Sequence, residues 1–107
     1  MDLTKKHCVP CEGNIPPLDA ATVAAYAGNI PGWKIADNKK LVREFRFKDF
    51  KMAMAFVNRV AEIAESEQHH PDISVSYNLV HLKLTTHAIH DLSENDFIVA
   101  AKVDALC

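Results

Sequence analysis

Two stretches near the middle of the chain alternate apolar and polar residues with a period of two. They cover positions 33–35 and 41–47, and this period is typical of strands that bury one face. The turn residues at positions 37–39 (Asp-Asn-Lys) separate them, so the two stretches predict a β-hairpin. Arg43 interrupts the alternation of the second stretch.

A second pair of alternating stretches follows later in the chain. Ile73, Val75 and Tyr77 alternate with polar residues, and so do the apolar residues of segment 80–84. The apolar phase shifts by one position near Asn78, which predicts a tight turn or a bulge there. These residues therefore form either two strands or one bent strand.

Two segments before this second pair show helical patterns. The longer one begins at a capping Asp49 and runs to about Glu67, because its apolar residues recur every three or four positions. This apolar stripe consists of Phe50, Ala53, Met54, Val57, Val60, Ala61 and Ala64. A shorter helix is bracketed by Asp19 and Gly28, which are typical residues for the two ends of a helix.

A last helix is predicted from Ser93, because Asp96 three positions later fits the spacing of a capping box. The element order α-β-β-α-β-β-α predicts an α+β fold of two layers, with helices packed on one face of a four-stranded antiparallel sheet. Residues 1–17 hold three of the five prolines and predict an irregular N-terminal arm. Residues 18–107 are expected to form a single domain, as the length of 107 residues suggests.

Composition narrows the class of protein. Apolar residues make up 49% and charged residues 24% of the chain, as in globular proteins. Twelve Lys and Arg against fourteen Asp and Glu give a net charge of −2, which argues against nucleic acid as a partner. The apolar runs are too short to span a membrane, so we expect no membrane association. Three cysteines, an odd number, and no recognisable signal sequence favour the cytoplasm.

Histidine is the most informative residue type in the sequence. Four of the six histidines fall between positions 69 and 87. His69 and His70 directly follow the long helix and His87 ends a strand, so rigid elements hold all three where a cleft can form. Because imidazole donates and accepts protons near neutrality, these residues are candidates for general acid and base catalysis. The structural alternative is that the pair after the helix only complements the helix dipole.

Metal binding is the competing interpretation. The same three histidines are candidate zinc ligands with Glu65 as a carboxylate ligand, although Glu65 could equally hydrogen-bond an imidazole and fix its tautomer. Cys8 and Cys11 have the two-residue gap of zinc knuckles and redox motifs, but two free thiols explain them as well. We expect no metal, and we expect His81 and His90 to face solvent.

One composite motif joins the segments that carry the histidines. It consists of Glu65-Ser66-Glu67-Gln68-His69-His70-Pro71, then Tyr77, then Thr85-Thr86-His87, then Asp96. This motif, with its spacing, resembles the signature of the pterin-4a-carbinolamine dehydratases. The segments 32–33 and 45–50 are similar to the same family, so the resemblance covers about residues 18–106.

The resemblance implies roles for individual residues. His69 and His87 would be the proton-transfer pair, and His70 would bind and orient the ring. Further substrate contacts, through backbone groups or short side chains, would come from Gln68, Thr85, Thr86 and Ala88. Glu65 would orient a histidine, and Asp96 would either do the same or only cap the last helix.

The resemblance also implies an activity, the dehydration of 4a-hydroxytetrahydropterin to quinonoid dihydropterin. This reaction recycles the pterin cofactor of aromatic amino acid hydroxylation. The implied assembly is a homodimer or homotetramer, and the implied chemistry uses no metal or organic cofactor, since the pterin is the substrate. The alternative function is a non-enzymatic oligomerisation module that binds another protein. The three histidines favour the enzyme, because a scaffold has no need of them.

Overall fold

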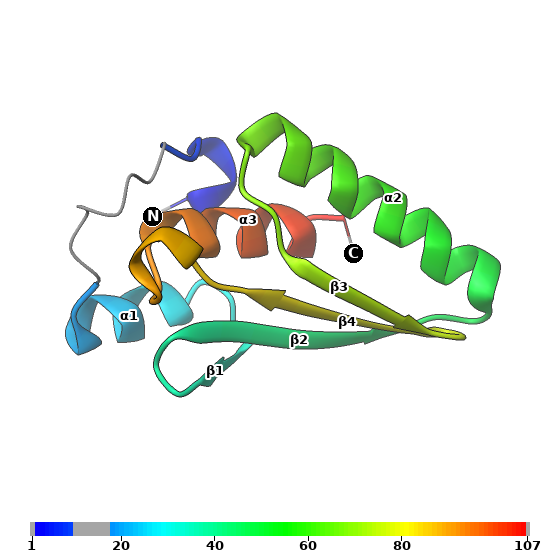
Figure 1. Ribbon diagram of the computed structural model, residues 1–107, viewed down its shortest axis with the longest axis horizontal. Helices are drawn as coiled ribbons and strands as arrows, with labels where there is room; N and C mark the ends of the chain where they lie inside the picture. The colour runs from blue at the N-terminus through cyan, green and yellow to red at the C-terminus, as the bar shows by residue number, and fades with distance from the viewer. Residues whose placement is uncertain (1, 10–17, 107) are drawn as a thin grey trace.

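The structure is a computed structural model that describes residues 2–9 and 18–106. Its helices and strands follow one another in the predicted order (Figure 1), which confirms the α+β class. The helices are α1 (Ala20–Ala27), α2 (Phe50–Glu67) and α3 (Glu94–Asp104). The strands are β1 (Lys34–Ala36), β2 (Lys40–Arg46), β3 (Asp72–Ser76) and β4 (Leu79–Leu84), and two 3₁₀ turns are η1 (Leu3–Lys5) and η2 (His87–Ile89).

The four strands form one antiparallel sheet in the order β1-β2-β4-β3. Its two local hairpins close through tight turns in which φ is 54° at Asp37, 55° at Asn38 and 52° at Tyr77. Two consecutive left-handed residues, here Asp and Asn, are typical of hairpin turns whose twist matches that of the sheet. The phase shift near Asn78 is therefore a turn, and β3 and β4 are two separate strands.

The core lies between the sheet and the helices α2 and α3, which cover one face of the sheet (Figure 1). The sheet contributes Leu41, Phe45, Val80, Leu82 and Leu84, and the two helices contribute Ala53, Phe56, Val60 and Phe97 among others. Helix α3 is buried over most of its length, including the polar residues Asn95 and Asp96 of its first turn. Polar side chains at the start of α3 are thus held inside the domain.

The buried face of α2 is rotated from the predicted stripe. Phe50, which we expected to be buried, is 51% exposed, whereas Phe56 is 6% exposed. The residues that face the core are Ala53, Phe56, Val60, Ala64 and Glu67. These residues recur every three or four positions, as expected for one face of a helix. This buried face does not include Phe50, and its last residue is the carboxylate Glu67.

Arg43, which breaks the alternation of β2, reaches the end of α3. Its Nη1 donates to Oδ1 of Asp104 at 2.7 Å, and Trp33 Nε1 donates to the same oxygen at 2.8 Å. The guanidinium carbon lies 4.5 Å from the centre of the Phe45 ring. A cation near the C-terminus of a helix is favourable, so this exception to the pattern joins the sheet to α3.

The described part of the N-terminal arm packs against the domain. Leu3 in η1 is 2% exposed, and η1 contacts α3. Lys6 Nζ donates to Glu94 Oε1 at 3.3 Å. Positions 10–17 of the arm lie outside the described residues, and the boundary between arm and domain stays a prediction.

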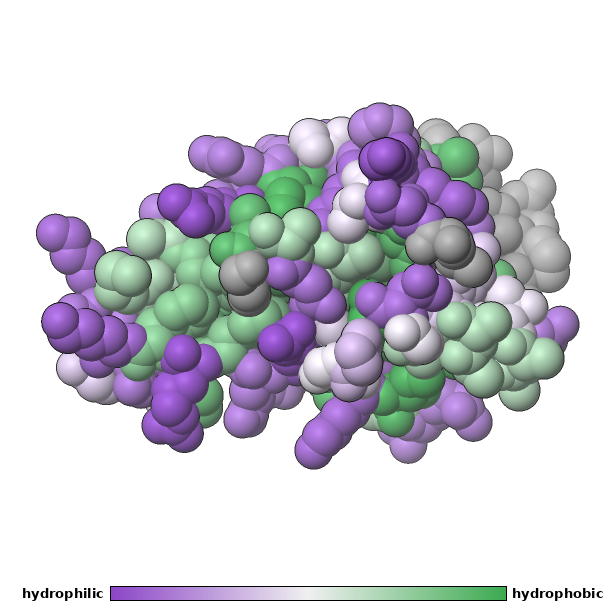
Figure 2. Space-filling model, turned by 180° about the vertical axis from the view of Figure 1, so that it is seen from behind, coloured by the Kyte–Doolittle hydropathy of each residue, from purple (hydrophilic) through white to green (hydrophobic). Residues whose placement is uncertain are grey.

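Apolar side chains also gather on the outside of the molecule. Seen from behind, they lie on the side where α2 begins (Figure 2), and Phe50 and Met52 of that helix are about half exposed. Ile73 on β3 and Tyr77 in the following turn are exposed as well. Within residues 2–9 and 18–106, the helices lack the length and apolarity needed to cross a bilayer.

Candidate active site

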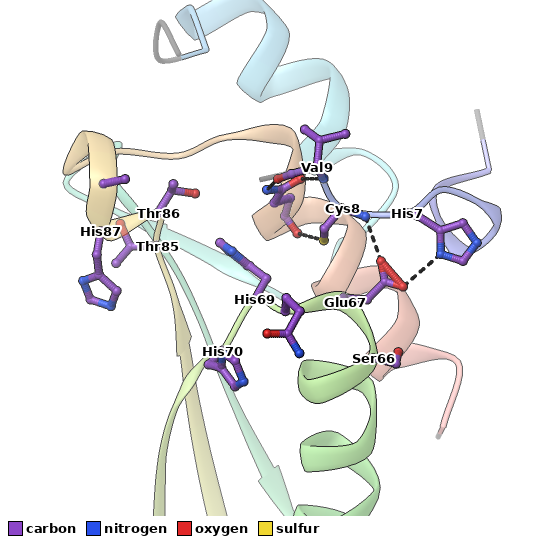
Figure 3. Close-up of a pocket in the computed structure, with 13 residues that line it drawn as sticks. His7, Cys8, Val9, Ser66, Glu67, His69, His70, Thr85, Thr86 and His87 are labelled. Atoms are coloured by element: carbon purple, nitrogen blue, oxygen red, sulfur yellow. Dashed lines mark hydrogen bonds and ion pairs between the residues drawn. The ribbon is translucent and has the colours of Figure 1, made fainter. Parts of the chain in front are cut away.

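A cavity of about 720 Å³ opens where the end of α2, the end of β4 and the start of α3 meet. This volume is typical of sites for small molecules. The cavity is lined by His7, Cys8, Val9, Ser66, Glu67, Gln68, His69, His70, Thr85, Thr86, His87, Ala88 and Asn95. Figure 3 shows His69 between His87 on one side and Glu67 on the other. The three candidate catalytic histidines and the four candidate contact residues therefore share one cavity.

The chain turns at Gln68 and so directs His69 and His70 away from the axis of α2. Gln68 has a left-handed φ of 53°, and its backbone N–H donates to the carbonyl of Ala64. A left-handed residue that closes the last turn is a common end of a helix. The Gln68 side chain also donates to the Glu65 carbonyl at 2.6 Å, which fastens this turn.

His69 is the most enclosed of the three histidines. Its Nε2 lies 2.6 Å from Oδ1 of Asp96, whose side chain is fully buried. The other oxygen, Oδ2, accepts from the backbone N–H of Ser93 at 2.9 Å and from the hydroxyl of Thr86 at 2.8 Å. Asp96 therefore caps α3 and contacts His69 at once. Because a carboxylate only accepts, Nε2 carries a proton, and Nδ1 of the neutral ring is left as an acceptor.

His70 pairs with Glu65 at the rim of the cavity. Nε2 of His70 lies 2.6 Å from Oε2 of Glu65. The two side chains are 56% and 73% exposed, so water screens this contact. The histidine that Glu65 contacts is thus His70, while His69 has the buried partner.

His87 is exposed and begins η2 at the far side of the cavity. The two threonines before it are fastened by their hydroxyls: Thr85 Oγ1 donates to the Lys39 carbonyl at 2.7 Å and Thr86 Oγ1 to Asp96. These bonds fix the end of β4, from which His87 and Ala88 continue along the cavity.

A second buried carboxylate, that of Glu67, lies beside the histidines. Its Oε1 accepts from the backbone N–H of Cys8 at 2.7 Å, and its Oε2 accepts from Lys102 at 2.9 Å and lies 3.0 Å from His7 Nδ1. Burial alone would raise the pKa of Glu67, but hydrogen bonds from Cys8, Lys102 and His7 outweigh burial and lower the pKa to about 2. Glu67 is therefore ionised at neutral pH and ties the N-terminal segment to α2.

Cys8 and Val9 form a wall of the cavity next to Glu67. The backbone of Val9 donates to Asn95 Oδ1 at 3.1 Å and accepts from Asn95 Nδ2 at 2.6 Å. Burial and the neighbouring charge of Glu67 raise the pKa of the Cys8 thiol to about 12. Cys11, its companion in the suggested zinc or redox motif, lies outside the described residues. Within the described part of the chain, no group of three His, Cys, Asp or Glu residues could hold a metal ion.

Among the residues that line the cavity, His7, Val9, Glu67 and Asn95 were not predicted from the sequence. Of these residues, Glu67 had a recognisable signal in the sequence: it is a charged residue three positions after Ala64, on the buried face of α2. The remaining described histidines do not line the cavity: His90 is exposed, and the half-buried His81 lies across from Glu44 in the sheet.

Comparison with known proteins extends over nearly the whole chain. A family model described as Pterin 4 alpha carbinolamine dehydratase matches residues 16–106. Several relatives carry the name "Putative pterin-4-alpha-carbinolamine dehydratase", and two of them show the extent of the similarity. The one from Nitrosospira multiformis is 50% identical and is matched over 98% of this chain and 92% of its own. The one from Halorhodospira halophila is 47% identical, over 99% and 98% respectively.

A solved structure from Brucella melitensis, described as a transcriptional coactivator/pterin dehydratase, has a similar fold. Its TM-score is 0.80 at 32% sequence identity. The match covers 85% of this chain and 98% of that chain. The similarity therefore includes both the sequence and the arrangement of the sheet and helices.

Proposed function

Because the chain belongs to the pterin 4 alpha carbinolamine dehydratase family, we propose that it removes water from 4a-hydroxytetrahydropterin to give quinonoid dihydropterin. The observation that carries this proposal is the shared cavity of His69, His70 and His87, with the buried Asp96 behind His69. The product rejoins the tetrahydropterin pool that aromatic amino acid hydroxylation uses only after a separate two-electron reduction.

The reaction needs two proton transfers. The bond between carbon 4a and its hydroxyl breaks, and the hydroxyl leaves as water after it receives a proton. The neighbouring ring nitrogen loses its proton, and the electron pair forms the new carbon–nitrogen double bond. Imidazoles suit both transfers, because a catalytic group works best when its pKa is near the working pH.

We assign the base to His69 and the acid to His87. Asp96 holds the Nε2 proton of His69, so Nδ1 accepts the proton from the ring nitrogen, and the carboxylate stabilises the imidazolium that forms. His87 lies on the other side of the cavity and delivers a proton to the departing hydroxyl. His70, at the rim, binds and orients the ring.

The remaining substrate contacts come from Gln68, Thr85, Thr86 and Ala88. The side chains of the first three already bond to the protein, so their backbone groups are the better candidates for contacts with the flat ring. This chemistry requires neither a metal nor an organic cofactor.

The test is the rate of quinonoid product formation, followed by ultraviolet absorbance, from freshly generated 4a-hydroxytetrahydropterin. The proposal predicts a rate well above that of buffer, unchanged by a metal chelator. A rate equal to that of buffer would favour the alternative, a module that binds another protein without catalysis.

We also infer that the protein is a cytoplasmic homodimer or homotetramer. Exposed apolar residues on α2 and on the edge strand β3 support association, and the free Cys8 thiol suits a reducing compartment. The molar mass from light scattering should be two or four times that of the 11.9 kDa chain. A monomer across the working concentration range would contradict the assembly.

A further inference from the structure

The cavity has a second end that the proposed dehydration does not use. Besides the histidines at the ends of α2 and β4, it is lined by residues 7–9, Ser66 and Glu67. We propose, on the basis of the proposed function, that this second end binds a hydroxylated substituent carried by the pterin ring, with His7 as the residue that contacts it.

The positions of the side chains separate the two ends. In Figure 3, His87 lies at one side of the cavity and His7 at the other, with His69 and Glu67 between them. The reacting ring must lie against His69 and His87 if these residues exchange protons with it. The part of the cavity beyond His69, toward Glu67, is then available to whatever is attached to the ring.

Segment 7–9 forms a wall of this second end, and hydrogen bonds to the domain hold the wall in place. Cys8 is hydrogen-bonded to Glu67 at the end of α2, and Val9 exchanges two hydrogen bonds with Asn95 at the start of α3. Upstream of these contacts, Leu3 is buried against the domain. A wall that is fixed before the ligand arrives loses little conformational entropy on binding.

His7 presents a hydrogen-bonding group at this end. Its Nδ1 lies 3.0 Å from the Glu67 carboxylate, which can only accept, so Nδ1 carries the proton and Nε2 of the neutral ring is an acceptor. The side chain is 81% exposed, which leaves this second nitrogen accessible to a ligand. Hydroxyl groups are suitable donors to it, whereas a methyl group offers none.

Segment 7–9 precedes the region that the family model matches, but it lies within the stretch that related proteins share. The family model begins at residue 16, whereas the relatives from Nitrosospira multiformis and Halorhodospira halophila are matched over 98% and 99% of this chain. In Figure 3, His7 lies beyond Glu67 on the side of the cavity away from His87, so it is placed to contact a substituent and not the reacting atoms. Loss of His7 should therefore change the choice of substrate and spare the turnover rate.

The experiment compares two 4a-hydroxytetrahydropterins, one with a dihydroxypropyl group and one with a methyl group on the same ring carbon. Wild type should have the higher kcat/KM for the hydroxylated substrate. His7→Ala should reduce this preference by about 5- to 10-fold, the value of one neutral hydrogen bond, through KM and with kcat nearly unchanged. Lys6→Ala is the matched control, because Lys6 is in the same segment of chain but does not line the cavity.

A second variant separates direct contact from support of Glu67. The amide of His7→Asn can replace Nδ1 toward Glu67 but has no group at the position of Nε2, so it should behave like His7→Ala. Full recovery in His7→Asn, or a preference unchanged in His7→Ala, would overturn the inference while the dehydratase activity stands. A wild type that dehydrates neither substrate faster than buffer overturns both proposals.

Discussion

His69 and Asp96 are joined by a contact of 2.6 Å between Nε2 and Oδ1, although 27 positions separate them in the sequence. The Asp96 side chain is completely buried and that of His69 is 12% exposed. The short distance and the low exposure make this contact a strong, directional one. It orients the imidazole and at the same time fixes the start of α3 against the end of α2.

Asp96→Asn should lower kcat on the order of 10²-fold. The amide can donate to Nε2 and so favour the wrong tautomer of His69, with the proton on Nδ1. The measurement is the steady-state rate of dehydration, with thermal unfolding as the check that the variant is folded. Asp96 would have no role in catalysis if a folded Asp96→Asn kept its kcat within about twofold of wild type.

Glu65→Gln should have little effect, since the contact between Glu65 and His70 is exposed to water. We expect a kcat within about twofold of wild type and a loss of unfolding free energy below about 1 kcal/mol. Steady-state kinetics and urea unfolding check both values. A tenfold loss of kcat would instead place Glu65 among the groups that act on the substrate.

The elements of the fold were predictable because their causes are local. The β1-β2 turn follows from Asp37 and Asn38, and the start of α3 follows from the spacing of Ser93 and Asp96. The rotation of α2 has no local cause: Phe50 and Phe56 both fit a helical stripe, and only packing against the sheet buries the second of them.

The candidate site, like the fold, was predictable only in part from the sequence. The three histidines stand at the ends of predicted elements, so their convergence could be anticipated. The contact of Cys8 with Glu67 spans 59 positions and that of Val9 with Asn95 spans 86. No periodicity links such distant residues, and segment 7–9 was therefore missed.

The carboxylate of Glu67 should make stability depend on pH in the acid range. Its pKa of about 2 in the folded chain lies below the ordinary value of 4.5, so its stabilising contribution is complete above about pH 4.5 and is lost as the pH falls toward 2. The loss amounts to at most about 3 kcal/mol. Unfolding free energies of wild type and Glu67→Gln, measured from neutral pH down to about pH 3, should therefore converge on acidification. Parallel curves would show that Glu67 is not held ionised by its partners.

The Cys8 thiol should resist alkylation in the folded protein. Its raised pKa of about 12 leaves almost no thiolate at mildly alkaline pH, and the thiolate is the reactive form. A chain in which Cys11 and Cys107 are replaced by Ser leaves Cys8 as the single thiol. Iodoacetamide should modify it in urea and only slowly in buffer, as measured by mass spectrometry. Equal rates in the two conditions would rule out a buried, protonated Cys8.

Replacement of His69 or His87 by Ala tests the central claim most directly. The measurement is kcat for the dehydration of 4a-hydroxytetrahydropterin, with His90→Ala as the control, because His90 is exposed and does not line the cavity. We predict losses on the order of 10²-fold or more for His69→Ala and His87→Ala, a weaker substrate affinity for His70→Ala, and wild-type kinetics for the control. Wild-type kcat in both His69→Ala and His87→Ala would contradict catalysis by histidine in this cavity.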